Sequence, residues 1–148
     1  MIRNYTSGTP VDRSVSFIEK KLVEAGARHI AKQYNDGTLC AIVFSLEHPG
    51  AKPFPIKLPA NVEACEHILL ARVRRPRKGT PQKVREQAER TAWKLLADWV
   101  DVQVAMIKLG QVEALEIFLP YMFNSFSGTT FYQELKASGF KALPFTPE

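Results

Sequence analysis

The stretch from Thr80 to Gly110 constrains the fold more than any other, because nothing within it breaks a helix after Pro81. Thr is a favoured cap at a helix N-terminus, and Pro is tolerated at the first helical position. Gly is favoured just past a helix end, where it adopts the left-handed conformation. The stretch therefore predicts a single helix over residues 81–109, roughly 43 Å long at ~1.5 Å per residue.

Two apolar stripes on this helix predict how it is buried. The first stripe contains Ala88, Ala92, Leu95, Trp99, Val102, Met106 and Leu109. The second stripe contains Trp93, Leu96, Val100, Val104 and Ile107. A helix that is apolar over most of its circumference is buried between layers, so we expect residues 95–109 to be sandwiched. The polar first turns, residues 83–90, should project into solvent, and the heptad-like spacing leaves a coiled-coil dimer as an alternative.

The length and composition are those of one globular domain. The chain has 148 residues, of which 24% are charged, so it can bury a core of its own and is unlike a disordered chain. It has no run of ~18 apolar residues that could span a membrane and no apolar signal segment at its N-terminus. We therefore expect a single domain over residues 1–148, no membrane partner and a cytoplasmic location.

The two cysteines, Cys40 and Cys65, both lie among apolar residues. Disulfides are rare where thiols stay reduced, and a buried free Cys packs as a small apolar side chain. A metal site built from these cysteines with His48 and His67 is an alternative, but the spacing lacks the paired ligands typical of zinc. We therefore predict plain packing for both cysteines, with no metal and no cofactor.

Residues upstream of the long helix predict a helix, three strands and another helix. Residues 1–10 have the composition of a flexible lead, and the apolar spacing of residues 11–25 predicts a helix. Residues 28–34 and 38–46 predict two strands joined by a tight turn at Asn35-Asp36-Gly37. The second of these strands is apolar on both faces and should be central, whereas residues 53–59 are rich in Pro and should form an edge strand. Asn61 should cap a helix over residues 62–73.

Short helices are expected after the long one, over residues 112–122 and 130–137. Between them we expect an aromatic cluster from Phe118 to Phe126, and after them an apolar tail, residues 140–145, that docks back on the body. The chain is thus predicted to be an α+β protein. It should have an α-β-β-β-α core with an antiparallel three-stranded meander in residues 11–75, followed by the long buried helix and short C-terminal helices in residues 80–148.

The α-β-β-β-α order resembles that of the double-stranded-RNA-binding domain. The resemblance covers residues 11–75 and is one of topology, because the position of that family's lysine cluster is occupied here by Asn61-Val62-Glu63-Ala64.

Two segments resemble small proteins of tailed phages and prophages. One is residues 86–99, followed by Gln103 and by Phe118-Leu119-Pro120-Tyr121-Met122, and the other is residues 58–64. This resemblance spans most of residues 12–135. It implies a phage origin and hence the cytoplasm of a host cell, but no activity and no functional residues.

The positive charge of the chain is concentrated in one segment. Fourteen residues contain seven cations and no acid, namely Arg72, Arg74, Arg75, Arg77, Lys78, Lys83 and Arg85. The rest of the chain has 13 Lys and Arg residues against 15 Asp and Glu residues. Clustered cations attract phosphate backbones, and Arg suits two-pronged contacts with phosphate or guanine. We expect these seven residues to bind DNA or RNA, with Tyr34 and Phe54 as candidate stacking residues; the alternative is a solvated loop.

The best candidates for catalysis are Asp98 and Asp101, three residues apart on the polar face of the long helix. Neighbouring carboxylates can share a proton or hold a divalent metal. A nuclease would also need a third acid, such as Asp36 or Glu47, and Lys94 is spaced to form an ordinary ion pair with Asp98. No glycine-rich phosphate loop or nucleophile elbow is present. We therefore predict no catalytic residues.

The sequence thus predicts a non-catalytic nucleic-acid-binding protein, with replication or recombination as the process that suits a phage. The alternative is a protein-binding or oligomerising module, such as a phage inhibitor of a host or defence factor. Its interface would be the second stripe of the long helix and the aromatic C-terminus, and its partner a second copy or a host protein.

Overall fold

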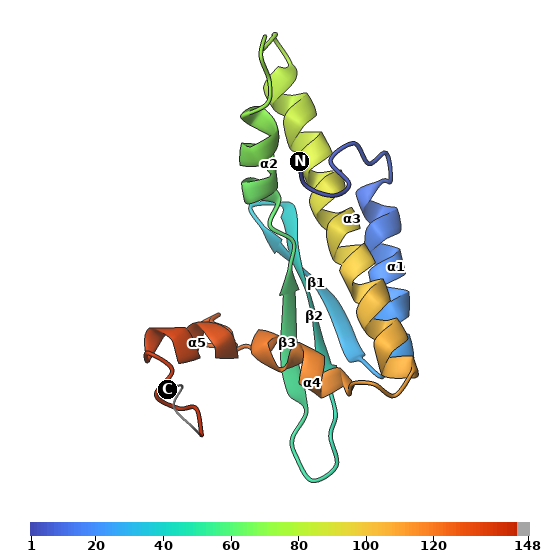
Figure 1. Cartoon of the computed structure of the whole chain (residues 1–148), viewed down its shortest axis with the longest axis vertical. Coiled ribbons are helices and arrows are strands. Elements are labelled where there is room, and N and C mark those ends of the chain that lie inside the picture. The colour runs from blue at the N-terminus through green and yellow to red at the C-terminus, as the bar shows by residue number, and fades with distance from the viewer. Residues whose placement is uncertain (145–148) are drawn as a thin grey trace.

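The computed structural model describes residues 1–144 and shows a three-stranded antiparallel sheet with helices packed on one face (Figure 1). In chain order the elements are α1 (Val11–Glu24), β1 (Arg28–Asn35), β2 (Thr38–Leu46), β3 (Phe54–Pro59), α2 (Val62–Leu70), α3 (Thr80–Lys108), α4 (Ala114–Phe118), the 3-10 turn η1 (Leu119–Tyr121) and α5 (Phe131–Ala137). This arrangement confirms the predicted α+β fold.

The sheet has the predicted order, with β2 between β1 and β3. The β1–β2 turn has positive φ at Asp36 (50°) and Gly37 (78°), as a primed two-residue hairpin turn requires. The free edge of β3 is partly covered by the chain that follows η1. The amide of Phe123 donates to the carbonyl oxygen of Pro55 at 3.0 Å, and Met122 pairs with Ile56.

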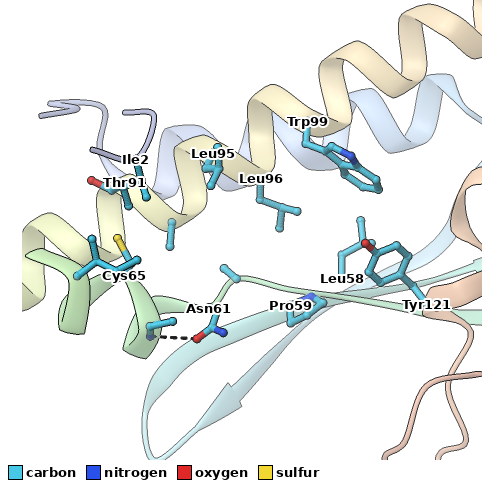
Figure 2. A pocket seen from close by; sticks show the side chains of 14 residues that line it. Ile2, Leu58, Pro59, Asn61, Cys65, Thr91, Leu95, Leu96, Trp99 and Tyr121 are labelled. Atoms are coloured by element: carbon cyan, nitrogen blue, oxygen red, sulfur yellow. Dashed lines mark hydrogen bonds between the residues drawn. The ribbon is translucent and has the colours of Figure 1, made fainter. Parts of the chain in front are cut away.

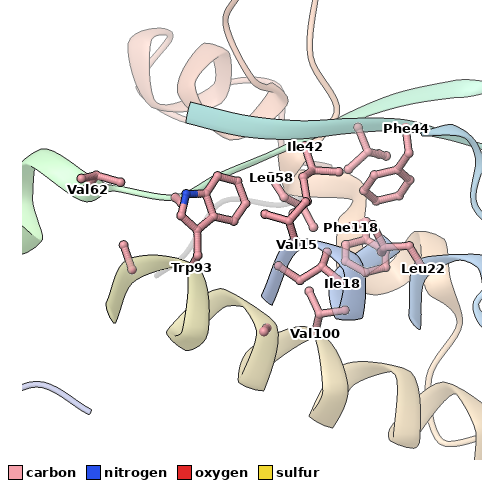
Figure 3. Packing of buried hydrophobic residues seen from close by; sticks show 14 of the residues in the cluster. Val15, Ile18, Leu22, Ile42, Phe44, Leu58, Val62, Trp93, Val100 and Phe118 are labelled. Atoms are coloured by element: carbon pink, nitrogen blue, oxygen red, sulfur yellow. The ribbon is translucent and has the colours of Figure 1, made fainter. Parts of the chain in front are cut away.

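The core lies between the inner face of the sheet and the helices α1 and α3 (Figure 3). Its largest side chains, each no more than 3% exposed, are Val15, Ile18, Leu22, Ile42, Phe44, Ile56, Leu58, Trp93, Val100, Val104 and Phe118. Phe118 of α4 closes one end of this core, with edge-to-face contacts to Phe44 at 5.4 Å and Trp99 at 6.0 Å between ring centroids. Burying such side chains is the main favourable term in folding, at about 25 cal/mol per Å² of apolar surface.

The ends of α3 follow local chemistry. At the C-terminus Gly110 is left-handed (φ 74°), and the amides of Gly110 and Gln111 donate to the carbonyls of Ile107 and Met106 at 3.0 and 3.2 Å. Those bonds satisfy carbonyls that the helix leaves free. At the N-terminus the expected cap is not formed. The hydroxyl of Thr80 accepts instead from the amide of Arg77 at 2.8 Å and so holds the preceding loop.

Burial of α3 is one-sided, which corrects the predicted sandwich. The second stripe faces the core, with Trp93, Val100 and Val104 no more than 1% exposed. The first stripe is buried only at Ala88 and Ala92, in the half of α3 where α2 packs, and its continuation is open. In that continuation Leu95 is 40%, Val102 56% and Leu109 79% exposed. The sandwich fails because α2 is only nine residues long and no further layer follows it over this part of α3 within residues 71–144.

The first turns of α3 run past the end of the sheet, as expected, but they are not free on all sides (Figure 1). Helix α2 packs against them, whereas α1 packs farther along α3 over the sheet. Arg85, Glu89 and Arg90 are therefore half-buried.

Residues 1–10, expected to be a flexible lead, lie along α3 instead. The hydroxyl of Thr91 donates to the carbonyl oxygen of Asn4 at 2.9 Å. The side-chain amide of Gln87 donates to the carbonyl oxygen of Ser7 at 3.0 Å. The side-chain amide of Asn4 donates to Asp98 at 2.9 Å. These bonds satisfy the buried hydroxyl of Thr91 and hold the lead on the helix surface.

The C-terminal part differs from its prediction in how it packs. Thr130 caps α5 as expected, its hydroxyl accepting from the amide of Gln133 at 3.2 Å. The aromatic rings in contact are those of Phe44, Phe118, Trp99 and Tyr121, whereas Phe126 is fully exposed. The tail lies on α5, where Phe140 contacts Tyr132 at 6.1 Å between centroids, and does not dock on the core. Phe145 lies outside the described residues.

Candidate nucleic-acid interface

The predicted basic segment forms the end of a helical hairpin. Helices α2 and α3 run side by side past the end of the sheet and are joined by residues 71–79 (Figure 1). We refer to this loop together with the first turn of α3, residues 71–83, as the basic tip. The tip is the point of the molecule farthest from the sheet on this side (Figure 1).

Hydrogen bonds fix both ends of the loop. On the α2 side the amides of Arg72 and Val73 donate to the carbonyls of Leu69 and Leu70 at 3.2 and 3.0 Å. On the α3 side the amide of Thr80 donates to the carbonyl of Arg77 at 3.0 Å, which complements the Thr80 hydroxyl bond. Gly79, the last residue of the loop, has a left-handed backbone conformation (φ 94°), which costs less conformational energy for Gly than for other residues. The loop therefore presents its side chains from a defined backbone.

Six of the seven predicted cations are exposed on the tip, namely Arg72, Arg74, Arg75, Arg77, Lys78 and Lys83. None of them forms an ion pair with an acid anywhere in residues 1–144. They lie within a few residues of one another, a spacing over which charges act together at physiological salt, where the Debye length is ≈ 8 Å. The tip thus carries positive charge that the described part of the chain does not neutralise.

Arg85 differs from the other six cations because it is paired with acids of the chain. Its guanidinium donates to Glu66 of α2 at 3.0 Å and lies 3.5 Å from Glu89. The hydrogen bond to Glu66 raises the pKa of Arg85 above its usual value. The reason is the packing of α2 on α3, which brings an acid from 19 residues away against this side chain.

Arg72 has a second contact, with the lead. Its guanidinium lies over the ring of Tyr5, 5.9 Å from the centroid, which is a cation–π distance. Both side chains remain exposed. This contact ties the base of the tip to residues 1–10 and occupies one face of the tyrosine ring.

Acidic side chains lie on the two helices next to the tip, on the side of the sheet. Glu63 and Glu66 on α2 and Glu86 and Glu89 on α3 lie on the body side of the basic segment. The first turn of α3 contains no acid, so the partial positive charge of this helix end adds to that of the cations. The positive surface is therefore confined to the end of the hairpin.

A groove of about 590 Å³ lies away from the tip, between α2, α3, β3 and η1 (Figure 2). Ile68, Leu95, Leu96, Trp99 and Tyr121 make its lining largely apolar, and no carboxylate, amine or imidazole lines it. Two of its polar side chains are already engaged: Asn61 accepts from the amide of Ala64 at 3.1 Å, and Thr91 donates to Asn4. Burial raises the pKa of the Cys65 thiol, which keeps it protonated at neutral pH. The groove therefore offers no carboxylate, amine or imidazole for acid–base chemistry, and its thiol is in the protonated form.

Asp98 and Asp101 are engaged in separate ion pairs. Asp98 is bound by Arg3 at 3.1 Å and Lys94 at 3.2 Å, and the latter pair was predicted from the spacing. Burial acts to raise the pKa of Asp98, but hydrogen bonds from Asn4, Arg3 and Lys94 outweigh it and hold that pKa below its ordinary value. Asp101 lies 3.5 Å from Lys21 of α1. The two carboxylates are thus paired with different cations, an arrangement typical of structural ion pairs.

The other candidates for chemistry are dispersed. Cys65 packs in the core as predicted, and Cys40 is half-buried on β2, with its thiol donating to the carbonyl oxygen of Gln33 at 3.3 Å. Residues 1–144 contain no group of three or more His, Cys, Asp or Glu side chains that could hold a metal ion. Tyr34 is exposed on β1, whereas Phe54 packs against the core.

Comparisons of the chain with protein-family models, with curated proteins and with solved structures found no match. Within residues 1–144 there is no helix that combines the length and the apolar character needed to cross a bilayer.

Proposed function

We propose that this protein binds nucleic acid through the basic tip and has no catalytic activity. The observation that carries the proposal is the set of six exposed cations on the tip, which have no acid partner within residues 1–144. Each phosphate that such a cation neutralises releases condensed counterions, which favours binding. A compact, projecting cluster of this kind suits a polymer of phosphates better than a single small anion.

The cellular setting is part of the proposal. The resemblance of residues 86–99 and 58–64 to small proteins of tailed phages supports the cytoplasm of a host cell as the compartment. Replication or recombination of phage nucleic acid would be the process in which a non-catalytic binding protein serves.

The salt dependence of binding tests the proposal. If all six cations contact phosphates, the logarithm of the affinity should fall with the logarithm of the salt concentration with a slope of about −5 on duplex DNA. The affinity should then drop about a thousandfold between about 50 mM and about 200 mM salt. Fluorescence anisotropy of a labelled duplex measures the slope. Binding that salt does not weaken, or no binding at about 50 mM, would rule the proposal out.

A second candidate function, self-association, is favoured by the open part of the first stripe. The prediction named the second stripe as the interface, but that stripe is in the core. The exposed stripe runs Leu95, Trp99, Val102, Met106 and Leu109 with alternating steps of four and three, the spacing by which two helices pair. The flanking residues Leu96, Gln103 and Ala105 are uncharged, and the flanking Asp98 is paired with Arg3 and Lys94, so two copies of this stripe would meet with little repulsion between like charges.

Val102→Asp is the variant that tests self-association. In a dimer joined through this stripe, the new carboxylate would be buried near its counterpart, so the variant should be monomeric at concentrations at which the wild type is dimeric. Sedimentation velocity measures the change. Val23→Asp on α1 is the matched control, because Val23 is 62% exposed against 56% for Val102 and lies off the stripe. A wild type that stays monomeric at high concentration would refute this candidate.

A further inference from the structure

We infer that the ligand of the basic tip is double-stranded DNA and that the loop of the tip enters a groove of the duplex. The inference rests on the proposed function and names the substrate class of the same site. It follows from three properties of the tip: the absence of aromatic side chains, its width, and the kind of cation it presents.

The tip lacks the side chains with which proteins hold single strands. Single-strand binders combine a positive groove with aromatic rings on which successive bases stack. No Phe, Tyr or Trp occurs between Phe54 and Trp93, so neither the loop nor the turns of α2 and α3 next to it contribute a ring. The one ring at the base of the tip, that of Tyr5, has Arg72 over it. The exposed Tyr34 and Phe126 lie on β1 and on the loop before α5, on other parts of the fold. The tip therefore offers charge without stacking.

The shape of the tip fits a groove. Nine residues join the two helices, and the loop extends beyond the helix pair (Figure 1). The major groove of B-form DNA is about 12 Å wide and admits one helix or a two-stranded ribbon. Two helices packed about 8–10 Å apart, each about 10–12 Å across, are wider than that groove. The loop can therefore enter the groove while the helix pair stops at the phosphate backbones on either side.

This geometry gives the six cations two different positions. Arg74, Arg75, Arg77 and Lys78 lie in the loop and would enter the groove. Arg72 and Lys83 lie where the loop joins α2 and α3, and would face the phosphates along the groove edges. Three of the four loop cations are Arg, whose planar fork matches the O6 and N7 acceptors that guanine presents in the major groove.

The same geometry disfavours duplex RNA. The major groove of A-form RNA is too deep and narrow for side chains to read, and its minor groove is wide and shallow. A projecting loop has little to enter there, whereas the major groove of B-form DNA is wide enough to admit a helix or a two-stranded ribbon. Duplex RNA and single strands are therefore expected to bind by charge alone.

Three ligands of one sequence test the inference: a DNA duplex of about two helical turns, one of its strands, and the duplex RNA. Competition anisotropy at a single salt concentration compares their affinities. The duplex DNA should bind at least about tenfold more tightly than either of the other two. A single strand or an RNA duplex that binds as tightly as the DNA duplex would overturn the inference and leave the proposed function standing. If none of the three binds, the proposed function itself fails.

A charge-conserving variant separates groove entry from electrostatic attraction. The combined change Arg74→Lys, Arg75→Lys and Arg77→Lys keeps three positive charges but removes three guanidinium forks. It should leave single-strand binding within about twofold of the wild type and reduce the preference for duplex DNA at least about threefold. The control is Arg13→Lys, the same change at an exposed arginine outside the tip that likewise has no ion-pair partner within residues 1–144. A lysine variant of the tip that keeps the whole preference for duplex DNA would contradict entry of the arginines into the groove.

Discussion

Replacing Arg74, Arg75 and Arg77 together with alanine is expected to weaken binding to duplex DNA about a hundredfold at low salt. The slope of log affinity against log salt should also become shallower, by about 0.9 for each of the three residues that contacts a phosphate and so by up to about 3. All three side chains are exposed, and none forms an ion pair within residues 1–144. The fold should therefore be unaffected, with an unfolding free energy within about 0.5 kcal/mol of the wild type. Anisotropy titrations at several salt concentrations measure both effects.

The control removes the same charge from elsewhere. Arg13, Lys20 and Lys52 are exposed and have no ion-pair partner in the described part of the chain, and all three lie outside the tip. Their triple alanine variant should change the slope by less than about 1, since these residues contact no phosphate. Equal losses in the two variants would mean that net charge rather than the tip drives binding. A tip variant that binds as the wild type does would refute the proposed function.

The elements of this fold were predictable because local chemistry marks their ends. Asp36 and Gly37 supply the two positive φ values that a tight hairpin turn needs, and Asn61 and Gly110 mark helix ends by the bonds they make possible. The cluster of cations on the basic tip was predictable for a similar reason, because these residues are neighbours along the chain. The pair of Lys94 with Asp98 also follows from spacing on a single helix.

What could not be predicted depends on contacts between distant residues. The apolar spacing of α3 shows which of its residues are apolar but not whether a layer covers them, so the exposure of Val102 and Leu109 has no local signal. The lead is held by a bond between Asn4 and Asp98, which are 94 residues apart. For the candidate site, the neutralisation of Arg85 depends on where α2 places Glu66. The contact of Arg72 with Tyr5 likewise depends on the lead folding back onto the hairpin.

The largest effect on stability is expected from Trp93→Ala, which should lower the free energy of unfolding by about 3–5 kcal/mol. Trp93 is 1% exposed, and its side chain points from α3 toward the sheet (Figure 3). It belongs to the same core cluster as Val62 of α2 and Leu58 of β3. Truncating it removes apolar surface from the core and leaves a cavity that the surrounding helices and sheet fill only in part. Urea denaturation followed by circular dichroism measures the loss.

Trp99→Ala is the matched control, because it is the same change in side chain six residues further along α3. Trp99 is half-buried and lines the open groove, so water can occupy part of the space its ring leaves (Figure 2). Its truncation should cost at least about 1 kcal/mol less than that of Trp93, although it removes edge-to-face contacts with Phe118 and Tyr121. A larger loss for Trp99 than for Trp93 would mean that the first stripe of α3 is the buried one. The core would then lie on the side of the helix that is open here, and the face that supports the self-association candidate would no longer be available.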